Sequence, residues 1–284
     1  MCDTRDTGFY QSAIDVINAL TLRQANATLS RYESKSAQFL TTNLFSSLAS
    51  VASSYCIQID QPVPWNVWQI YTDVASSRLK LASMLYCQGD LHRSAFVLND
   101  VQQRLDNSVT TVCSCRKPPN EQRSEAFCEY ALRHGNPETL TRKMAFCVGF
   151  MREEMYCAPA ILWFEMCRSV GDDVAYRNSA ESVWMDWAEV DARPFMLYLQ
   201  YLTFGGLCER QRQLQALQGL WDICLNRVTF DSMFYLETVV NLLDHCVEME
   251  GHMEIALGIY NASRNLKPRN NAANLHIHRL TGLQ

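Results

Sequence analysis

Two cysteines of the chain, Cys113 and Cys115, lie one residue apart and could supply two thiolates to a zinc ion. Cys128 and His134 could complete the four ligands of a tetrahedral site. One intervening residue is fewer than the roughly two to four that separate paired cysteines in zinc sites. Cys128 and His134 also follow at no recurring spacing. We therefore interpret these residues as loop residues and predict no bound metal.

A second candidate metal site is the pair Glu189 and Asp191, whose carboxylates are separated by one residue. On a strand, both carboxylates would lie on one face and could share a magnesium ion, as nucleotidyl transfer requires. Here the pair enters an expected helix with Pro194 in its first turn, and no upstream Gly-Ser turn accompanies it. Helix capping by Asp191 is therefore the favoured interpretation.

Basic residues gather near the C-terminal end of the chain. From Ile255 to Gln284 there are four basic residues, two histidines and no carboxylate. Such a group could bind a phosphate or the acidic end of a peptide. The favoured interpretation is that these cations lie at helix C-termini, where the helix dipole stabilises them, and binding stays open as the alternative. The residues are Arg264, Lys267, Arg269, His276, His278 and Arg279.

The segment 184–204 is rich in aromatic residues, which could form a ligand cage or a stacking platform. Aromatic residues at helical spacing more often belong to a hydrophobic core, so core packing is favoured. The residues are Trp184, Trp187, Phe195, Tyr198, Tyr201 and Phe204.

The usual phosphate-binding and catalytic signatures are missing from the chain. It contains no G-x-x-x-x-G-K, no G-x-G-x-x-G, no G-x-S-x-G and no H-E-x-x-H. The sequence therefore predicts a protein that is not an enzyme and that carries no cofactor.

Helical hairpins are the elements expected to position these side chains. Residues 236–273 have the pattern of one tetratricopeptide-like repeat, in which Gly251 supplies the left-handed turn and Pro268 ends the second helix. The small side chain of Ala256 falls where the two helices must approach closely, and the ring of Tyr260 falls where the space between them must be filled. The expected apolar stripes are Leu236, Val240, Leu243 and Val247 on the first helix, and Ile255, Ile259, Ala262 and Leu266 on the second.

Two further hairpins of the same design are expected. The first spans 65–105 and turns at Gly89; the second turns at Gly205 and Gly206, and its second helix carries Leu214, Leu217, Trp221 and Cys224. The spacing of Met144, Val148, Met151 and Met155 also predicts a helix over residues 141–170. No strand alternation is evident. The predicted fold class is all-α, with stacked antiparallel helical hairpins that are TPR-like but irregular in period.

Composition limits the class of protein. The chain has 284 residues, 48% of them hydrophobic, and a net charge of −5, which gives no general attraction to nucleic acid. Its twelve cysteines are scattered, and several (Cys87, Cys147, Cys167, Cys224 and Cys246) fall inside expected helices. No secretory signal and no apolar segment long enough for a membrane span are recognised, so a cytoplasmic location with no membrane partner is expected.

Four regions are predicted from proline, glycine and charge. They are an N-terminal helical region at 1–60, a first helical hairpin at 61–112, a linker or long loop at 113–140, and a helical-repeat region at 141–284.

Four segments carry a resemblance to a known family. They are DVASSRLKLASMLYCQGDLHRSAFVLNDV, AFCVGFMREEMYCAPAILWFEMCRSVGDDVA, WMDWAEVDARPFMLYLQYLTFGGL and the part of 242–280 around LLDHCVEMEGHMEIAL, and they extend over most of residues 71–280. The chain resembles the helical C-terminal tail of molluscan and lancelet proteins that contain a Mab-21 nucleotidyltransferase-like region, which is related to cyclic GMP–AMP synthase. The catalytic core of that family has a Gly-Ser turn, which this sequence lacks, so the resemblance implies a tail without the nucleotidyltransferase core.

The expected function is that of a non-enzymatic scaffold that binds a protein or peptide partner. The alternative is an accessory module of a Mab-21-like or cyclic GMP–AMP synthase-like system that senses nucleic acid, and a nucleic-acid partner is the less favoured of the two. The oligomeric state is left open. The residues predicted to contact a partner are Asn241, His245, Arg264, Lys267, Asn270 and Asn271.

Overall fold

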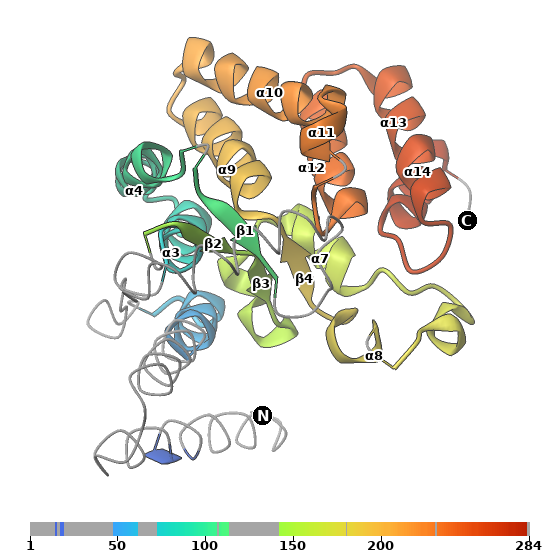
Figure 1. Ribbon diagram of the computed structural model, residues 1–284, viewed down its shortest axis with the longest axis horizontal. Helices are drawn as coiled ribbons and strands as arrows, with labels where there is room; N and C mark the ends of the chain where they lie inside the picture. The colour runs from blue at the N-terminus through green and yellow to red at the C-terminus, as the bar shows by residue number, and fades with distance from the viewer. Residues whose placement is uncertain are drawn as a thin grey trace.

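Helices account for most of the residues that the computed structural model describes, which are 48–61, 73–106, 108–113, 142–179, 181–230 and 232–282, with positions 15, 18 and 19. Three helix pairs follow one another across the molecule (Figure 1). They are α3 (Ser76–Cys87) with α4 (Leu91–Arg104), α9 (Ala192–Gly206) with α10 (Arg210–Leu225), and α12 (Leu236–Met249) with α13 (Met253–Leu266).

One type of turn joins the helices of all three pairs. A right-handed helical residue is followed by a left-handed residue and then by the N-cap of the second helix. The left-handed residue is Gly89 in the first pair (φ +79°) and Gly251 in the third (φ +83°), as the sequence predicts. In the second pair it is Cys208 (φ +61°), because Gly205 and Gly206 still belong to α9.

Replacing Cys208 with glycine is expected to stabilise the protein. A residue with a Cβ atom pays a steric cost in the left-handed region that glycine avoids, although glycine also gains freedom in the unfolded chain. For Cys208→Gly we expect a net gain of about 0.5–1 kcal/mol in the free energy of unfolding by urea. The matched control Gly251→Ala should lose about 1 kcal/mol. A destabilised Cys208→Gly variant would show that the thiol has a packing role at this turn.

The expectation of a fold without strands is wrong in detail. Among the described residues, four short strands form two ladders: β1 (Thr110–Val112) pairs in parallel with β2 (Met144–Phe146), and β3 (Val148–Phe150) pairs antiparallel with β4 (Ala188–Val190). Two of these strands occupy the first half of the helix predicted over 141–170. A short 3-10 helix, η2 (Arg152–Cys157), follows them.

Burial alternates within each of the strands β2 and β3, with a shift at Cys147 between them, and the partners of both strands are distant. Ala145, Val148 and Phe150 are buried, whereas Phe146 and Gly149 are partly exposed. The spacing of Met144, Val148, Met151 and Met155 matches the helical period of about 3.6, although Met144 lies in β2, Val148 in β3 and Met155 in η2. The strands form because they pair with residues far apart in the chain, and such pairing cannot be predicted from the local spacing of apolar residues.

The elements between α4 and α12 that lie outside the helix pairs are short. After η2 the chain forms α7 (Ala160–Met166), η3 (Asp173–Tyr176) and α8 (Glu181–Trp184), and α11 (Arg227–Phe230) lies between α10 and α12. The last helix, α14 (Ala273–Thr281), packs on α13. Of the helix predicted over 141–170, the part at Ala160–Met166 is helical in α7, and Pro159 occupies its N-cap position.

Helix α9 lies at the centre of the hydrophobic core. It contacts α3, α4, α10 and α12, and the largest buried cluster draws residues from Val74 to Ala256, so the predicted regions 61–112 and 141–284 both contribute to it. Most of the region 1–60 and, apart from Cys113, the region 113–140 lie outside the described residues. Within the described residues, no helix is long and apolar enough to cross a membrane.

The second helices of two hairpins bury a face that is shifted from the predicted one, and of the predicted stripes Leu217, Trp221, Cys224 and Ile259 pack against the core only partly buried. In α13 the buried residues are Ala256, Tyr260 and Ser263, while Ile255 and Leu266 of the expected stripe are 53% and 51% exposed. In α10 the buried residues are Ala216, Leu220 and Ile223, and Leu214 is exposed. Helix α12 buries its expected stripe, with Leu236 only partly buried.

Candidate functional site

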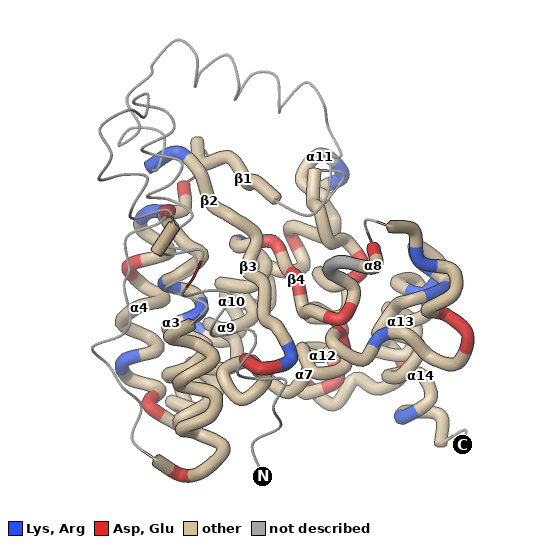
Figure 2. The backbone as a smooth tube through the Cα atoms, turned by 90° about the horizontal axis from the view of Figure 1, so that it is seen from below, with Lys and Arg blue, Asp and Glu red and all other residues tan. Residues whose placement is uncertain are grey.

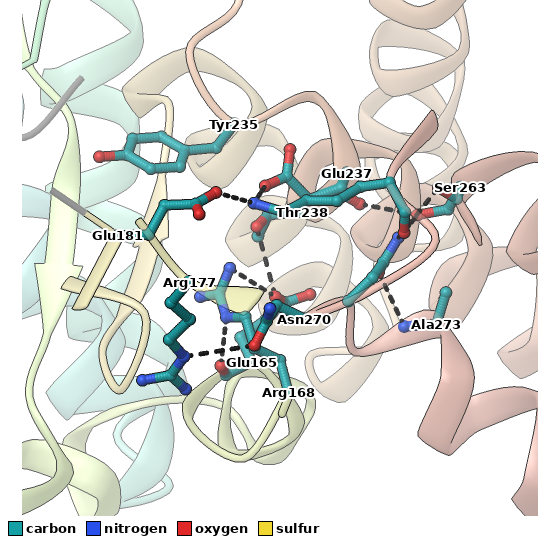
Figure 3. Close-up of polar contacts among 12 residues, drawn as sticks. Glu165, Arg168, Arg177, Glu181, Tyr235, Glu237, Thr238, Ser263, Asn270 and Ala273 are labelled. Carbon is teal, nitrogen blue, oxygen red and sulfur yellow. Dashed lines mark hydrogen bonds and ion pairs between the residues drawn. The ribbon is translucent and has the colours of Figure 1, made fainter. Parts of the chain in front are cut away.

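Four of the six residues predicted to bind a partner meet in one place: Asn241, Lys267, Asn270 and Asn271. They belong to a network that joins α7, η3, α12, α13 and the turn before α14 (Figure 3). We call this network the interior polar cluster. It consists of Glu165, Arg168, Asp173, Arg177, Glu181, Glu237, Thr238, Asn241, Ser263, Lys267, Asn270 and Asn271.

A buried ion pair forms the base of the interior polar cluster. Arg168 and Glu165 are both almost fully buried, and Nη1 of Arg168 lies 3.5 Å from Oε2 of Glu165. Arg168 also donates to the carbonyl oxygens of Glu165 and Trp187, each at 2.7 Å. Oε1 of Glu165 accepts from Nδ2 of Asn241 at 2.8 Å. Burial raises the pKa of Glu165, and Arg168 acts against that rise.

The two neighbouring asparagines fix the turn that leads into α14. The Nδ2 group of Asn271 donates to the carbonyl oxygens of Ser263 and Lys267, and its Oδ1 accepts from the backbone of Ala273 at 3.0 Å. Asn270 has a positive φ of 53°, and its backbone N–H and its Nδ2 both donate to Asp173. Asn241, Asn270 and Asn271 are therefore buried and hydrogen-bonded inside the protein, so they are not presented to a partner.

The basic residues near the C-terminus lie against carboxylates from other segments. Lys267 lies 3.0 Å from Glu181 and 3.8 Å from Glu237. Arg279 pairs with Glu248 at 2.6 Å, and Arg269 lies 3.7 Å from Asp172. Acidic positions accordingly lie beside basic ones around α13 and α14 (Figure 2). The charge asymmetry of the sequence is thus compensated in the fold.

His245 and Arg264 lie apart from the interior polar cluster. Nδ1 of His245 is 2.9 Å from the hydroxyl oxygen of Tyr198, and burial lowers the pKa of His245. Arg264 is exposed on α13 and donates to Oδ1 of Asn261 one turn earlier. Of the six predicted residues, Arg264 is the one whose side chain is fully on the surface.

The candidate metal ligands have other roles or are not described. Cys115, Cys128 and His134 lie outside the described residues. Glu189 lies in β4 and not in a helix, which corrects the expectation for the Glu189–Asp191 pair. Asp191 occupies the N-cap position of α9, but its carboxylate accepts from the backbone N–H groups of Phe234 and Tyr235 at 3.0–3.2 Å, and so holds the start of α12. Among the described residues no group could hold a metal ion.

The aromatic segment forms core and not a cage. Phe195, Tyr198, Tyr201 and Phe204 are all buried along α9. Trp187 packs partly buried against a smaller cluster around Tyr235, and the side chain of Trp184 lies outside the described residues.

Asp244 is a buried carboxyl group on α12, and neither of its oxygens has a hydrogen-bond partner of good geometry in the part of the chain that the structure describes. Burial, and next to it the charge of Glu248, raise the pKa of Asp244 to about 9. The group is therefore neutral in the folded protein at neutral pH and ionised in the unfolded chain. Its contribution to stability is fully present below its unfolded pKa and is lost as pH rises through the folded value.

The neutral isostere Asp244→Asn is expected to stabilise the protein increasingly with pH. The substitution removes the free-energy penalty of keeping the carboxyl group protonated in the folded protein. We therefore expect no gain in the free energy of unfolding near pH 4 and a gain of about 1–2 kcal/mol at pH 8. This gain is smaller than the full pKa difference between the folded and unfolded states would give, because local opening hydrates the carboxylate. The measurement is urea unfolding across this pH range. Asp222→Asn, at an exposed position of α10, should show no such trend. Parallel stability curves for Asp244→Asn and the wild-type protein would contradict the interpretation.

Apart from Lys267, sequence reasoning did not single out the charged members of the interior polar cluster. Glu165 and Arg168 lie in the segment AILWFEMCRSV, where every neighbour but Ser169 is apolar. Two opposite charges three residues apart within such a segment are a recognisable signal of a buried pair.

Comparison of the chain with protein-family models, with curated proteins and with solved structures gives no match. The resemblance to the Mab-21 tail therefore stays a prediction.

Proposed function

We propose that this protein is a helical-repeat scaffold whose hairpins stack in a TPR-like manner and bind a protein partner. The observation that carries the proposal is the exposed apolar line along α13. Ile255, Ile259, Ala262 and Leu266 follow one another at spacings of four, three and four, so they lie on one side of the helix. Ile255 and Leu266 are half exposed and Ala262 is exposed, whereas Ile259 is partly buried against the core. Such a line suits the apolar face of a partner helix.

The charge distribution favours a protein partner over nucleic acid. An accessory module of a nucleic-acid-sensing system would need cations that are available to phosphates. Lys267, Arg269 and Arg279 are instead engaged with carboxylates, which leaves Arg264 as the exposed cation nearest the apolar line. Arg264 lies on a different side of α13 from Ile255, so the two groups can be tested separately.

The test is partner capture from native tissue extract with three baits besides the wild-type protein. They are Ile255→Asp/Leu266→Asp, Arg264→Glu, and the control Phe96→Asp, which changes an exposed apolar residue on α4. We expect a protein captured by the wild type and by the control to be lost with the Ile255→Asp/Leu266→Asp bait, without a lower melting temperature.

Two outcomes would argue against the scaffold. If the double variant captures the same proteins as the wild type, the line on α13 is not the binding surface. If nucleic acid is captured instead, and affinity falls steeply with salt and with Arg264→Glu, the accessory-module alternative is favoured. Lys267→Glu is unsuitable for this test because it would place three carboxylates together.

A further inference from the structure

Two cysteines lie side by side where the parallel ladder of β1 and β2 ends. The register pairs Val112 with Phe146, so the next residues are Cys113 and Cys147. The backbone N–H of Cys147 donates to the carbonyl oxygen of Val112 at 3.0 Å, which continues the ladder to this point. Neighbouring strands are about 4.8 Å apart. That spacing lies within the roughly 4.4–6.8 Å between the Cα atoms of disulfide-bonded residues.

The side chains of both cysteines lie in the same surroundings. Sγ of Cys113 is 3.0 Å from the hydroxyl oxygen of Tyr235, and Sγ of Cys147 is 4.0 Å from Oδ1 of Asp191. Both pack against the small cluster of Met185, Phe234 and Tyr235, and both are partly exposed. A hydrogen bond with Cys113 is one of the causes that raise the pKa of Cys147, after burial, which is consistent with thiols that face each other.

We propose that Cys113 and Cys147 form a dithiol site that closes to an intramolecular disulfide by exchange with a small disulfide such as glutathione disulfide. One cysteine attacks the glutathione disulfide, forms a mixed disulfide and releases one glutathione thiol. The second cysteine then attacks the protein sulfur of the mixed disulfide and releases the second glutathione. The two cysteine protons end on the two glutathione sulfurs, and the two electrons lost by the cysteines reduce the glutathione disulfide.

The site differs from the exposed single cysteines in the outcome of this reaction. Cys167 and Cys208 are exposed and should stop at the mixed disulfide with glutathione. Cys113 and Cys147 should react more slowly, because burial keeps the Cys147 thiol protonated, but they should finish as a bridge without bound glutathione. The bridge would replace the contact between the Cys113 thiol and Tyr235 and would tie β1 to the junction between β2 and β3.

The experiment treats the full reduced chain with glutathione disulfide, blocks remaining thiols with iodoacetamide and maps peptides by mass spectrometry without reduction. We expect a peptide pair linked through Cys113 and Cys147, glutathione on Cys208, and a melting temperature that rises when the bridge forms. In Cys147→Ser, Cys113 should instead retain glutathione as a mixed disulfide. Phenylarsine oxide, which needs two thiols on one arsenic atom, should bind the wild type and neither Cys113→Ser nor Cys147→Ser at this site.

Three results would overturn the proposal. The first is a separate glutathione adduct on each of Cys113 and Cys147. The second is that both cysteines are still free thiols when Cys208 is fully modified. The third is a disulfide from either residue to another cysteine. The peptide map of the wild-type chain decides among these even if a serine variant fails to fold.

Discussion

Truncation of Phe195 to alanine is expected to remove about 3–5 kcal/mol from the free energy of unfolding. The ring is fully buried in the first turn of α9 and packs edge-to-face on Phe150 of β3, with 5.7 Å between the ring centroids. Phe195 therefore joins the helical core to the strands, and its loss leaves a cavity that the surrounding elements cannot fill. Urea unfolding followed by circular dichroism measures the change.

Phe96 provides the matched control for Phe195. It is the same residue type within a helix, α4, but it is 75% exposed, so Phe96→Ala should change the free energy of unfolding by less than about 0.5 kcal/mol. Similar losses for the two variants would mean that α9 does not occupy the centre of the core.

Replacing Arg168 with methionine is expected to cost about 3–5 kcal/mol, because it leaves the buried Glu165 carboxylate without its cation. The substitution keeps much of the apolar stem of the side chain, so the loss reports mainly on charge and hydrogen bonding. It also removes the donors to the carbonyl oxygens of Glu165 and Trp187. The measurement is again the free energy of unfolding, and Arg93→Met, on an exposed part of α4, is the control.

The double variant Glu165→Met/Arg168→Met separates charge from packing. If the penalty of Arg168→Met comes from an uncompensated carboxylate, removing that carboxylate as well should restore part of the lost stability. Losses that simply add would show that the two side chains act independently, which would contradict the ion pair as the base of the interior polar cluster.

The sequence predicted the local features of the fold well. Gly89 and Gly251 mark the turns of two hairpins, because a left-handed residue after a helix has a strong and local sequence signal. The turn at Cys208 has the same geometry without that signal. The strands were missed because their three-residue ladders depend on partners more than thirty residues away.

The candidate site was predicted in part. Asn241, Lys267, Asn270 and Asn271 were chosen together and do meet in space, but as interior hydrogen-bonding groups. Polar residues on a helical-repeat pattern are usually expected at the surface. Here Asn241 and Asn270 are turned inward by partners from distant segments, Glu165 and Asp173. The apolar line on α13 was predicted to lie in the core, but the sequence alone does not show which of two adjacent faces of a helix is buried against its neighbours.

The two strand ladders also bear on the order in which the chain folds. Each hairpin closes over a three-residue turn, so its contacts are local and cost little loop entropy. The ladders instead join Thr110 to Met144 and Val148 to Val190 and must close long loops before they gain any hydrogen bonds. The helical hairpins should therefore be formed in the folding transition state, and the strand region around Phe150 should be completed after it. Substitutions in the ladders would then mainly accelerate unfolding, whereas substitutions within the hairpins would slow folding.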